Sequence, residues 1–113
     1  MLLLSLMILV RDYVDEIGRR PFRHWVDNLH AEAARKIDTA LYRIEQQNLS
    51  NVKGVGKGVF EYRINYGPGY RIYFGKDGDS IVILLGGGTK QHQQRDIETA
   101  IIRWVDYKKR KET

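Results

Sequence analysis

The sequence predicts a single α+β domain over residues 1–113, with a small antiparallel-rich sheet backed by two N-terminal helices in the order β-α-α-β-β-β-α. Apolar residues recur with helical spacing between residues 21 and 47, and this spacing changes to alternation from residue 59 onward. A chain of 113 residues can bury one hydrophobic core but not two separate ones. Because the two early helices cover one face of the sheet, we expect the other face to be free for function.

The first ten residues, MLLLSLMILV, predict a buried first strand. They are too few to cross a bilayer, which takes about 20 apolar residues. No basic segment precedes them, and charged residues follow where a signal peptide has its cleavage site. If Met7 is the functional start, the strand runs from Met7 to Val14. We therefore expect a cytoplasmic protein that has no membrane partner.

Two helices are expected next. Pro21 suits the first turn of a helix, and one face of that helix is apolar: Phe22, Trp25, Val26 and Leu29. A second helix is predicted over residues 31–47, and polar residues from Asn48 to Asn51 end it. Its expected buried stripe consists of Ala34, Ile37, Leu41 and Ile44, and the charged residues Arg35, Lys36, Asp38 and Arg43 lie off that stripe.

The second half predicts three strands and a helix. Val59–Tyr66 and Tyr70–Phe74 alternate around Gly67-Pro68-Gly69, which indicates an antiparallel hairpin. A turn at 77–79 leads to a central strand, Ser80–Leu85, which three glycines at 86–88 end. Thr89 is the expected cap of a last helix, and the final basic residues 108–111 are expected to be solvated and frayed. The buried stripe of that helix is Ile97, Ala100, Ile101, Trp104 and Val105.

The net charge of +5 lies entirely in the second half of the chain. Residues 1–52 carry seven basic and seven acidic side chains, whereas residues 53–113 carry twelve and seven. This asymmetry indicates a polyanionic partner, or else a merely soluble basic surface. The absence of cysteine excludes disulfides and thiolate chemistry, and three histidines with no i, i+4 pair predict no metal site. The glycines at 54, 56 and 58 precede neither a helix nor a Lys-Ser/Thr pair, which excludes a P-loop. We expect no cofactor.

Side chains alternate across a strand, so Glu61, Arg63, Arg71 and Tyr73 are expected on the face that the helices leave open. A hairpin closed symmetrically about Pro68 places Arg63 opposite Tyr73 and Asn65 opposite Arg71. Further cations are expected nearby. Lys53 and Lys57 lie in the Gly-rich loop VKGVGKGV, and Lys90 and His92 follow the central strand.

Several cations on one face favour a nucleic-acid backbone, because arginine binds phosphate through a planar fork of donors. Cleavage of RNA also needs proton transfer to and from the reacting oxygens. Arg63 and Arg71 are the candidates for holding the scissile phosphate, with Lys53 and Lys90 as further RNA-binding residues. Lys57, Glu61 and His92 are candidates for moving the proton, and Tyr73 for stacking a base or donating to phosphate. Glu61 is equally a candidate ion-pair partner for Arg63.

Three segments carry a resemblance to a known family: GVFEYRINYGPGYRIYF at 58–74, LLGGGTK at 84–90 and QQRDI at 93–97. They resemble the HigB-like addiction-module killer proteins of the RelE/ParE superfamily, and the likeness runs from about Met7 to Trp104. The resemblance implies a RelE-like fold and a toxin of a type II toxin–antitoxin system. RelE-like members cut messenger RNA on the ribosome without a metal ion. The 2′-OH attacks the phosphate, which leaves a cyclic phosphate and a 5′-hydroxyl.

The same resemblance implies a cognate antitoxin, with a HigA-like helix-turn-helix domain, and implies the ribosome and its mRNA as partners. One feature departs from the RelE branch, because no C-terminal strand bearing a catalytic tyrosine is predicted here. Two alternatives therefore remain open. One is a ParE-like inhibitor of DNA gyrase that has no nuclease activity, and the other is a non-catalytic antitoxin-binding module.

Overall fold

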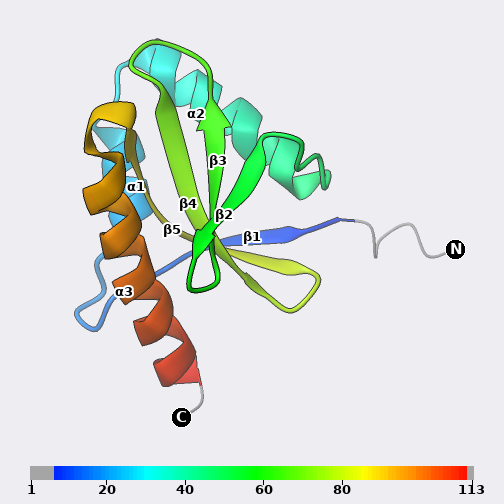
Figure 1. Ribbon diagram of the computed structural model, residues 1–113, viewed down its shortest axis with the longest axis vertical. Coiled ribbons are helices and arrows are strands. Elements are labelled where there is room, and N and C mark those ends of the chain that lie inside the picture. Colours follow the sequence, from blue (N-terminus) through cyan, green and yellow to red (C-terminus); the bar gives the residue numbers. More distant parts are fainter. Residues whose placement is uncertain (1–6, 112–113) are drawn as a thin grey trace, which may run out of the picture.

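The computed structural model describes residues 7–111 and shows one mixed sheet with helices on both sides (Figure 1). Along the chain the elements are β1 (Leu9–Asp12), α1 (Pro21–Asp27), α2 (Ala31–Glu45), β2 (Val52–Gly56), β3 (Val59–Ile64), β4 (Tyr70–Asp77), β5 (Ile81–Thr89), the 3-10 turn η2 (Lys90–His92) and α3 (Gln93–Lys111). The strands lie in the order β1-β5-β4-β3-β2. β1 runs parallel to β5, and the other neighbouring pairs are antiparallel.

The first strand is shorter than predicted. Of the expected stretch up to Val14, the structure places Leu9–Asp12 in β1, while residues 1–6 lie outside the described part of the chain. Within residues 7–111 no helix is both long and apolar enough to cross a membrane.

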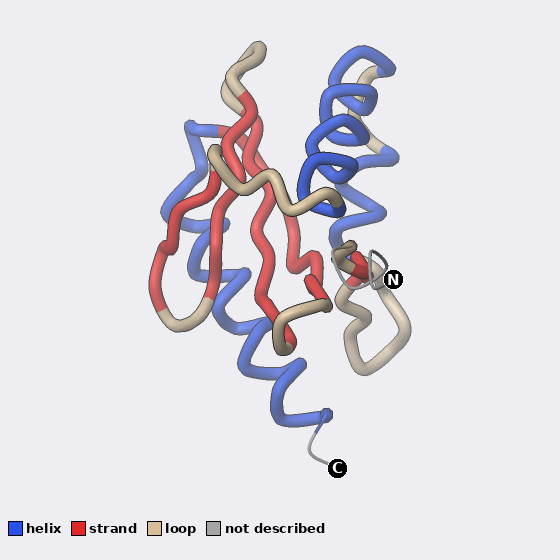
Figure 2. Tube along the Cα trace, turned by 90° about the vertical axis from the view of Figure 1, so that its right-hand side faces the viewer, coloured by secondary structure: helices blue, strands red, loops and turns tan. Residues whose placement is uncertain are grey.

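The predicted fold class is wrong, because the sheet has a strand more than expected and neither of its faces is left open. The observed order is β-α-α-β-β-β-β-α. The C-terminal helix α3 packs on the face opposite α1 and α2, and Figure 2 shows the sheet between these two layers. Phe22, Ile37 and Phe74 belong to the core under α1 and α2, whereas Leu85 and Trp104 belong to a second, smaller core under α3.

The additional strand, β2, occupies part of the glycine-rich stretch that was expected to be a loop. Val52 pairs with Tyr62 and Lys53 with Glu61. Lys57 and Gly58 join β2 to β3 with φ values of 57° and 84°, and positive φ at both positions is typical of a type I′ hairpin turn. Glycine and lysine have low strand propensity, so the pattern alone does not indicate a strand. Hydrogen bonding to the backbone of β3 stabilises the extended conformation that these residues do not favour by themselves.

The glycines at 86–88 were expected to end the central strand, yet β5 continues through them to Thr89. They allow close packing of the helices. A Cβ atom on Gly87 would lie 2.2 Å from the Trp25 ring of α1, and one on Gly88 would lie 1.9 Å from the Asp96 carboxylate of α3. The strand is irregular where Tyr73 pairs with Gly86 and Phe74 with Leu84.

The buried sides of the helices differ slightly from the predicted stripes. In α2 the buried residues are Ala33, Ile37, Ala40 and Ile44, so Ala34 and Leu41 lie at the margin. In α3 Ala100 and Trp104 are buried, while Val105 is 51% exposed. The Thr89 side chain makes no capping hydrogen bond, because η2 intervenes before α3. Periodicity indicates that a stripe exists, but the docking angle decides which neighbouring position is covered.

The last turn of α3 is held against the sheet, contrary to the expected fraying. Lys111 forms an ion pair with Asp77 at the end of β4, and the Tyr107 hydroxyl donates to the same carboxylate at 2.6 Å. One turn earlier, Arg110 pairs with Asp106 at 2.8 Å, and Asp106 also accepts from the Tyr13 hydroxyl at 2.6 Å.

These contacts at Asp77 predict a loss of stability in acid. The hydrogen bonds from Lys111 and Tyr107 hold the pKa of Asp77 below its ordinary value of 3.8. A carboxylate whose pKa is lower in the folded state stabilises that state above the unfolded pKa, and the contribution disappears as the pH falls through the folded pKa. Asp77→Asn should therefore lose less stability than wild type between about pH 6 and pH 3.

Urea unfolding at both pH values measures this difference. Asp79→Asn, which removes an exposed carboxylate from the neighbouring turn, is the matched control. An Asp77→Asn variant as acid-sensitive as wild type would contradict the assignment.

Candidate functional site

The hairpin of β3 and β4 brings Arg63 and Arg71 directly opposite each other. The predicted pairs are wrong, because the hairpin is centred on Gly67 rather than Pro68, and Glu61 faces Tyr73. Gly67 and Gly69 both have positive φ, at 55° and 79°, which glycine adopts without steric cost and which permits this loop. The predicted shared face of the two arginines is confirmed, since directly opposed residues of an antiparallel pair point to the same side.

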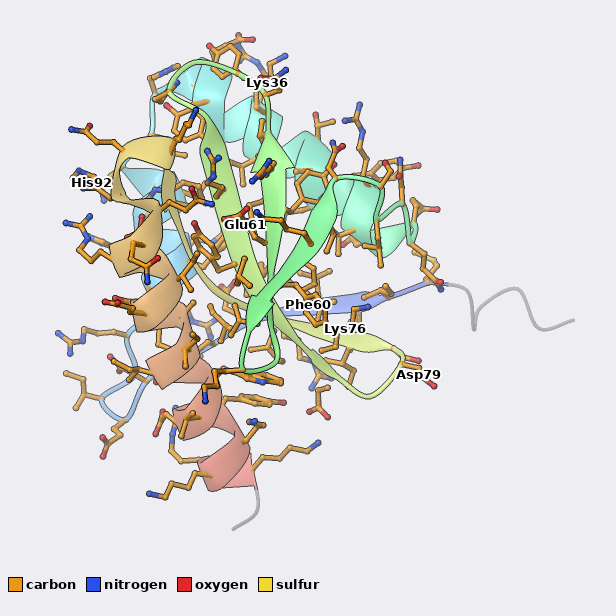
Figure 3. All side chains as sticks on the ribbon, in the orientation of Figure 1. Lys36, Phe60, Glu61, Lys76, Asp79 and His92 are labelled. Atoms are coloured by element: carbon orange, nitrogen blue, oxygen red, sulfur yellow. The ribbon has the colours of Figure 1, made fainter. Side chains whose placement is uncertain are left out.

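Glu61 is fully buried beside the two arginines and lies at the centre of a polar cluster (Figure 3). Its Oε1 accepts from Arg63 Nε at 3.1 Å, and its Oε2 accepts from the Tyr73 hydroxyl at 3.2 Å and from Gln93 Nε2 at 2.7 Å. Arg71 Nε lies 3.8 Å from the same Oε2. Such partners compensate for the removal of a carboxylate from water. Glu61 is therefore the ion-pair partner of Arg63 and has no exposed surface from which to take a substrate proton.

The two arginines differ in exposure, which separates their roles. The Arg63 side chain is 51% exposed, and its outer nitrogens are open to a ligand. The Arg71 side chain is only 8% exposed, and its Nη1 donates to the Gly69 carbonyl at 2.7 Å. Arg63 is thus placed for direct contact with a phosphate, whereas the buried Arg71 adds positive charge without contacting it.

Tyr73 is completely buried in the core under α3, where Leu85 and Trp104 also lie. Burial raises the pKa of its hydroxyl, and the nearby charge of Glu61 raises it further. The phenol is therefore neutral and donates to Glu61. The predicted stacking of Tyr73 on a base is wrong, because no part of its ring is accessible.

Two of the four predicted accessory cations lie near this cluster. Lys53 is exposed on β2 opposite Glu61, and the backbone N–H of Lys90 donates to the Pro68 carbonyl at 3.4 Å beside the hairpin loop.

The other two predicted cations lie elsewhere. Lys57 is in the turn before Val59, and Val59 and Arg63 are four positions apart in β3, a distance of roughly 13 Å. His92 is exposed on η2 and points away from Glu61 (Figure 3). Neither Lys57 nor His92 is brought to the arginines.

Arg63 also lines two adjoining hollows that share Asn51 and Asn65. The first has a volume of about 390 Å³ and includes Lys53, and the second, of about 260 Å³, includes Lys36 and Arg43 of α2. We call this surface the basic groove: Lys36, Arg43, Asn51, Lys53, Arg63 and Asn65. No acidic side chain is found among the described residues that line it. A groove of one charge sign concentrates polyanions and neutralises phosphates.

Three residues around the cluster were not predicted as site residues. Lys36 and Arg43 are seven positions apart on α2, a spacing that places both on one helix face and that could have indicated their shared location. The Lys36 ammonium also lies 5.2 Å from the centre of the Tyr66 ring. Gln93 carries no sequence signal, because only the packing of α3 brings it to Glu61.

This arrangement can bind a phosphate chain and stabilise negative charge that develops on phosphorus. Glu61 and Tyr73 are both buried beside Arg63, so neither can exchange a proton with a substrate. Within residues 7–111 no group of three or more metal-ligating side chains is present. The chemistry that the described residues can supply is positioning and charge.

The comparisons with known proteins give one relative. The chain is 39% identical over 80 residues to a Haemophilus influenzae protein that is described only as uncharacterized, and the match covers 70% of this chain and 81% of the relative. No family model matches the chain.

Proposed function

The chain belongs to the family of this Haemophilus influenzae protein, and we propose that it is the toxin of a type II toxin–antitoxin pair that cuts messenger RNA on the ribosome. As a ribosome-directed endoribonuclease it acts in the cytoplasm and needs no metal ion. A cognate antitoxin with a HigA-like helix-turn-helix domain neutralises it. The motifs at 58–74, 84–90 and 93–97 support this proposal through their likeness to HigB-like toxins.

The observation that carries the proposal is the placement of Arg63. A buried carboxylate holds its guanidinium at Nε, which leaves the outer nitrogens free, and Arg63 is the residue common to the hollow that contains Lys53 and the adjoining hollow that contains Lys36 and Arg43. A fixed arginine binds a phosphate through paired donors, while the lysines neutralise the neighbouring phosphates. This combination suits a single RNA strand better than a small neutral ligand.

Arg63 contacts the scissile phosphate and stabilises the charge of the phosphorane after the 2′-OH has attacked. The 2′-OH gives its proton to water, and the leaving 5′-oxygen takes one from water, so the products carry a 2′,3′-cyclic phosphate and a 5′-hydroxyl. Glu61 is buried and cannot take the 2′-OH proton, so the chain contributes charge and alignment, and the ribosome holds the RNA in the reactive geometry. Glu61 is a positioning residue, because it acts on the phosphate through Arg63, and Arg71 contributes positive charge without touching the phosphate.

Inducing the toxin in cells that lack the antitoxin tests this function. Wild type should arrest growth and create new RNA 5′ ends. Adaptor ligation should identify these ends as 5′-hydroxyls. Arg63→Ala should lower cleavage about 10²- to 10³-fold, as the loss of one charge-stabilising donor typically does. Arg35→Ala is the matched control, since this exposed α2 arginine does not line the groove. Equal arrest by wild type and Arg63→Ala would overturn the assigned site.

One observation favours a second candidate, a ParE-like inhibitor of DNA gyrase. Glu61 and Tyr73 are buried and cannot exchange protons with a substrate, and a non-nuclease toxin needs no such groups. The same induction separates the two activities, because a gyrase inhibitor triggers a DNA-damage response and leaves messenger RNA intact. Retained antitoxin binding without any growth arrest would instead identify a non-catalytic binding module.

A further inference from the structure

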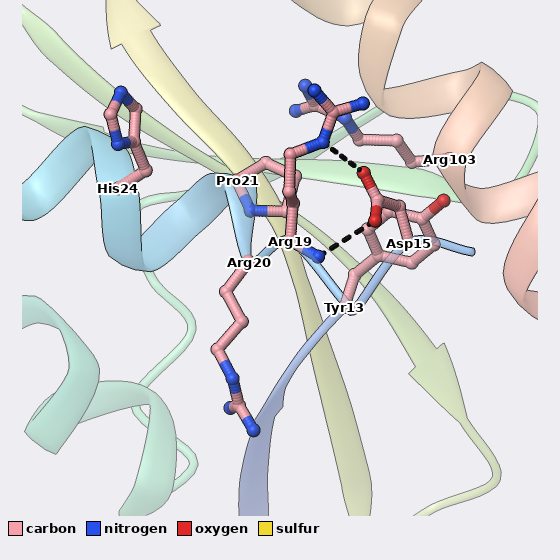
Figure 4. Close-up of a pocket in the computed structure, with 7 residues that line it drawn as sticks. All are labelled: Tyr13, Asp15, Arg19, Arg20, Pro21, His24 and Arg103. Atoms are coloured by element: carbon pink, nitrogen blue, oxygen red, sulfur yellow. Dashed lines mark hydrogen bonds and ion pairs between the residues drawn. The ribbon is translucent and has the colours of Figure 1, made fainter. Parts of the chain in front are cut away.

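A separate pocket of about 690 Å³ lies between the β1–α1 loop, the start of α1 and the middle of α3 (Figure 4). It is lined by Tyr13, Asp15, Arg19, Arg20, Pro21, His24 and Arg103. None of these residues lines the basic groove. Whatever this pocket binds is therefore not held by Arg63.

The pocket carries an excess of positive charge. Three arginines and one histidine face a single carboxylate, that of Asp15. Asp15 is engaged within its own loop, where it accepts from the backbone N–H groups of Ile17 at 3.0 Å and Arg19 at 2.8 Å, and from Arg19 Nε at 2.9 Å. This carboxylate therefore stabilises the turn and the Arg19 side chain. Arg20 pairs with Asp12 at 3.6 Å through one nitrogen, so Arg103 is the arginine of the pocket that Asp15 and Asp12 leave uncompensated.

Arg103 gives the strongest indication of a ligand. Its guanidinium is half-buried, and Nη1 donates to the Leu85 carbonyl at 2.8 Å. Within residues 7–111 no carboxylate lies within 4.0 Å of it. Burial lowers the pKa of this guanidinium, while Tyr13, Asp15 and Asp96 act on it from a longer range. A half-buried guanidinium with unused hydrogen-bond donors is stabilised by an anion that accepts from those donors.

The backbone makes room for this arginine. A Cβ atom on Gly86 would lie 2.7 Å from Arg103 Nη1, so a glycine at that position leaves space for the guanidinium beside β5. A second hollow of about 270 Å³ shares Pro21, His24 and Arg103 with the first, and extends it toward Trp25 and Thr99. Together they offer more space than a single inorganic anion needs.

We propose that His24 and Arg103, with the exposed Arg20 at the rim, form a binding site for the phosphate group of a nucleotide, separate from the basic groove. Guanidinium and imidazole donors suit phosphate oxygens, and the volume is in the range of roughly 300–1,000 Å³ that is usual for small-ligand pockets. The adjoining hollow holds the remainder of the nucleotide. The phosphate comes either from a free mononucleotide or from an RNA chain, which present the same group.

Titration calorimetry on the purified full chain tests the site with three probes: inorganic phosphate, adenosine 5′-monophosphate and a short RNA. Arg103→Gln and Arg20→Gln should each weaken nucleotide binding about tenfold, the usual effect of losing one hydrogen bond to a charged group. Arg35→Gln should leave binding unchanged. Binding of the mononucleotide identifies a small ligand, whereas binding of RNA alone, weakened by the same two variants, identifies the RNA chain.

Two outcomes would overturn the site: no binding of any probe by wild type, or equal binding by wild type and both variants. Loss of binding in Arg63→Gln with none in Arg20→Gln would also overturn it, and would assign the phosphate to the basic groove. Arg20 is 59% exposed in its side chain, so its variant keeps the test valid even if Arg103→Gln unfolds. Because no cell growth is measured, failure here is distinct from failure of the proposed toxin.

Discussion

Replacing Glu61 by alanine is expected to lower the free energy of unfolding by about 3–5 kcal/mol, the usual result of removing one partner from a buried ion pair. Glu61 is fully buried, and its loss leaves the 8%-exposed Arg71 without a countercharge among the described residues around it. The Tyr73 hydroxyl and Gln93 amide lose their acceptor as well. Urea unfolding followed by circular dichroism measures the change.

Glu98→Ala is the matched control, since this exposed α3 carboxylate accepts only a hydrogen bond from Gln94 one turn away. It should change stability by no more than about 0.5 kcal/mol. The double variant Glu61→Leu with Arg71→Met should cost less than the sum of the single variants, because it removes both buried charges. Strict additivity would show that the two residues are not coupled.

Replacing Trp104 by alanine should also cost about 3–5 kcal/mol, as truncation of a buried tryptophan usually does. Trp104 is 5% exposed and packs on the backbone of β4, where a Cβ on Gly75 would lie 2.5 Å from its ring. The second core is small, so few side chains can refill the cavity. Thermal and urea unfolding of the variant measure the loss.

The adjacent Val105→Ala is the control on the same helix, because Val105 is 51% exposed and should contribute no more than about 0.5 kcal/mol. If Trp104→Ala were as mild as Val105→Ala, α3 would not be anchored on the sheet as described. Trp104 does not line the basic groove, so a folded Trp104→Ala should still bind RNA.

Glu61 is expected to influence both phosphate binding and the stability of the fold. Glu61 stabilises the fold and also fixes the guanidinium of Arg63, whereas Arg63 itself is half-exposed and carries little packing. Arg63→Ala should therefore reduce function with little effect on unfolding, and Glu61→Ala should reduce both. This contrast distinguishes the contact residue from the positioning residue.

Several elements were accessible from the sequence because their signals are local. Alternation identified β3 and β4, the Gly-Pro-Gly segment identified their turn, and the spacing after Pro21 identified α1 and α2. The common face of Arg63 and Arg71 follows from the two-residue period of a strand, which does not depend on the partner. The strand β2 was missed, since VKGVG has little strand propensity of its own and depends on pairing with β3.

What the sequence alone established is the hairpin and the arginines that it carries on one side. The tertiary structure decided how those arginines are used. It docked α3 on the face expected to be open, buried Tyr73 and Glu61 beneath it, and brought Lys36 and Arg43 of α2 to the same groove as Arg63. The physical reason is that strand period and turn chemistry act between neighbours in the chain, whereas burial depends on surfaces that meet only after folding.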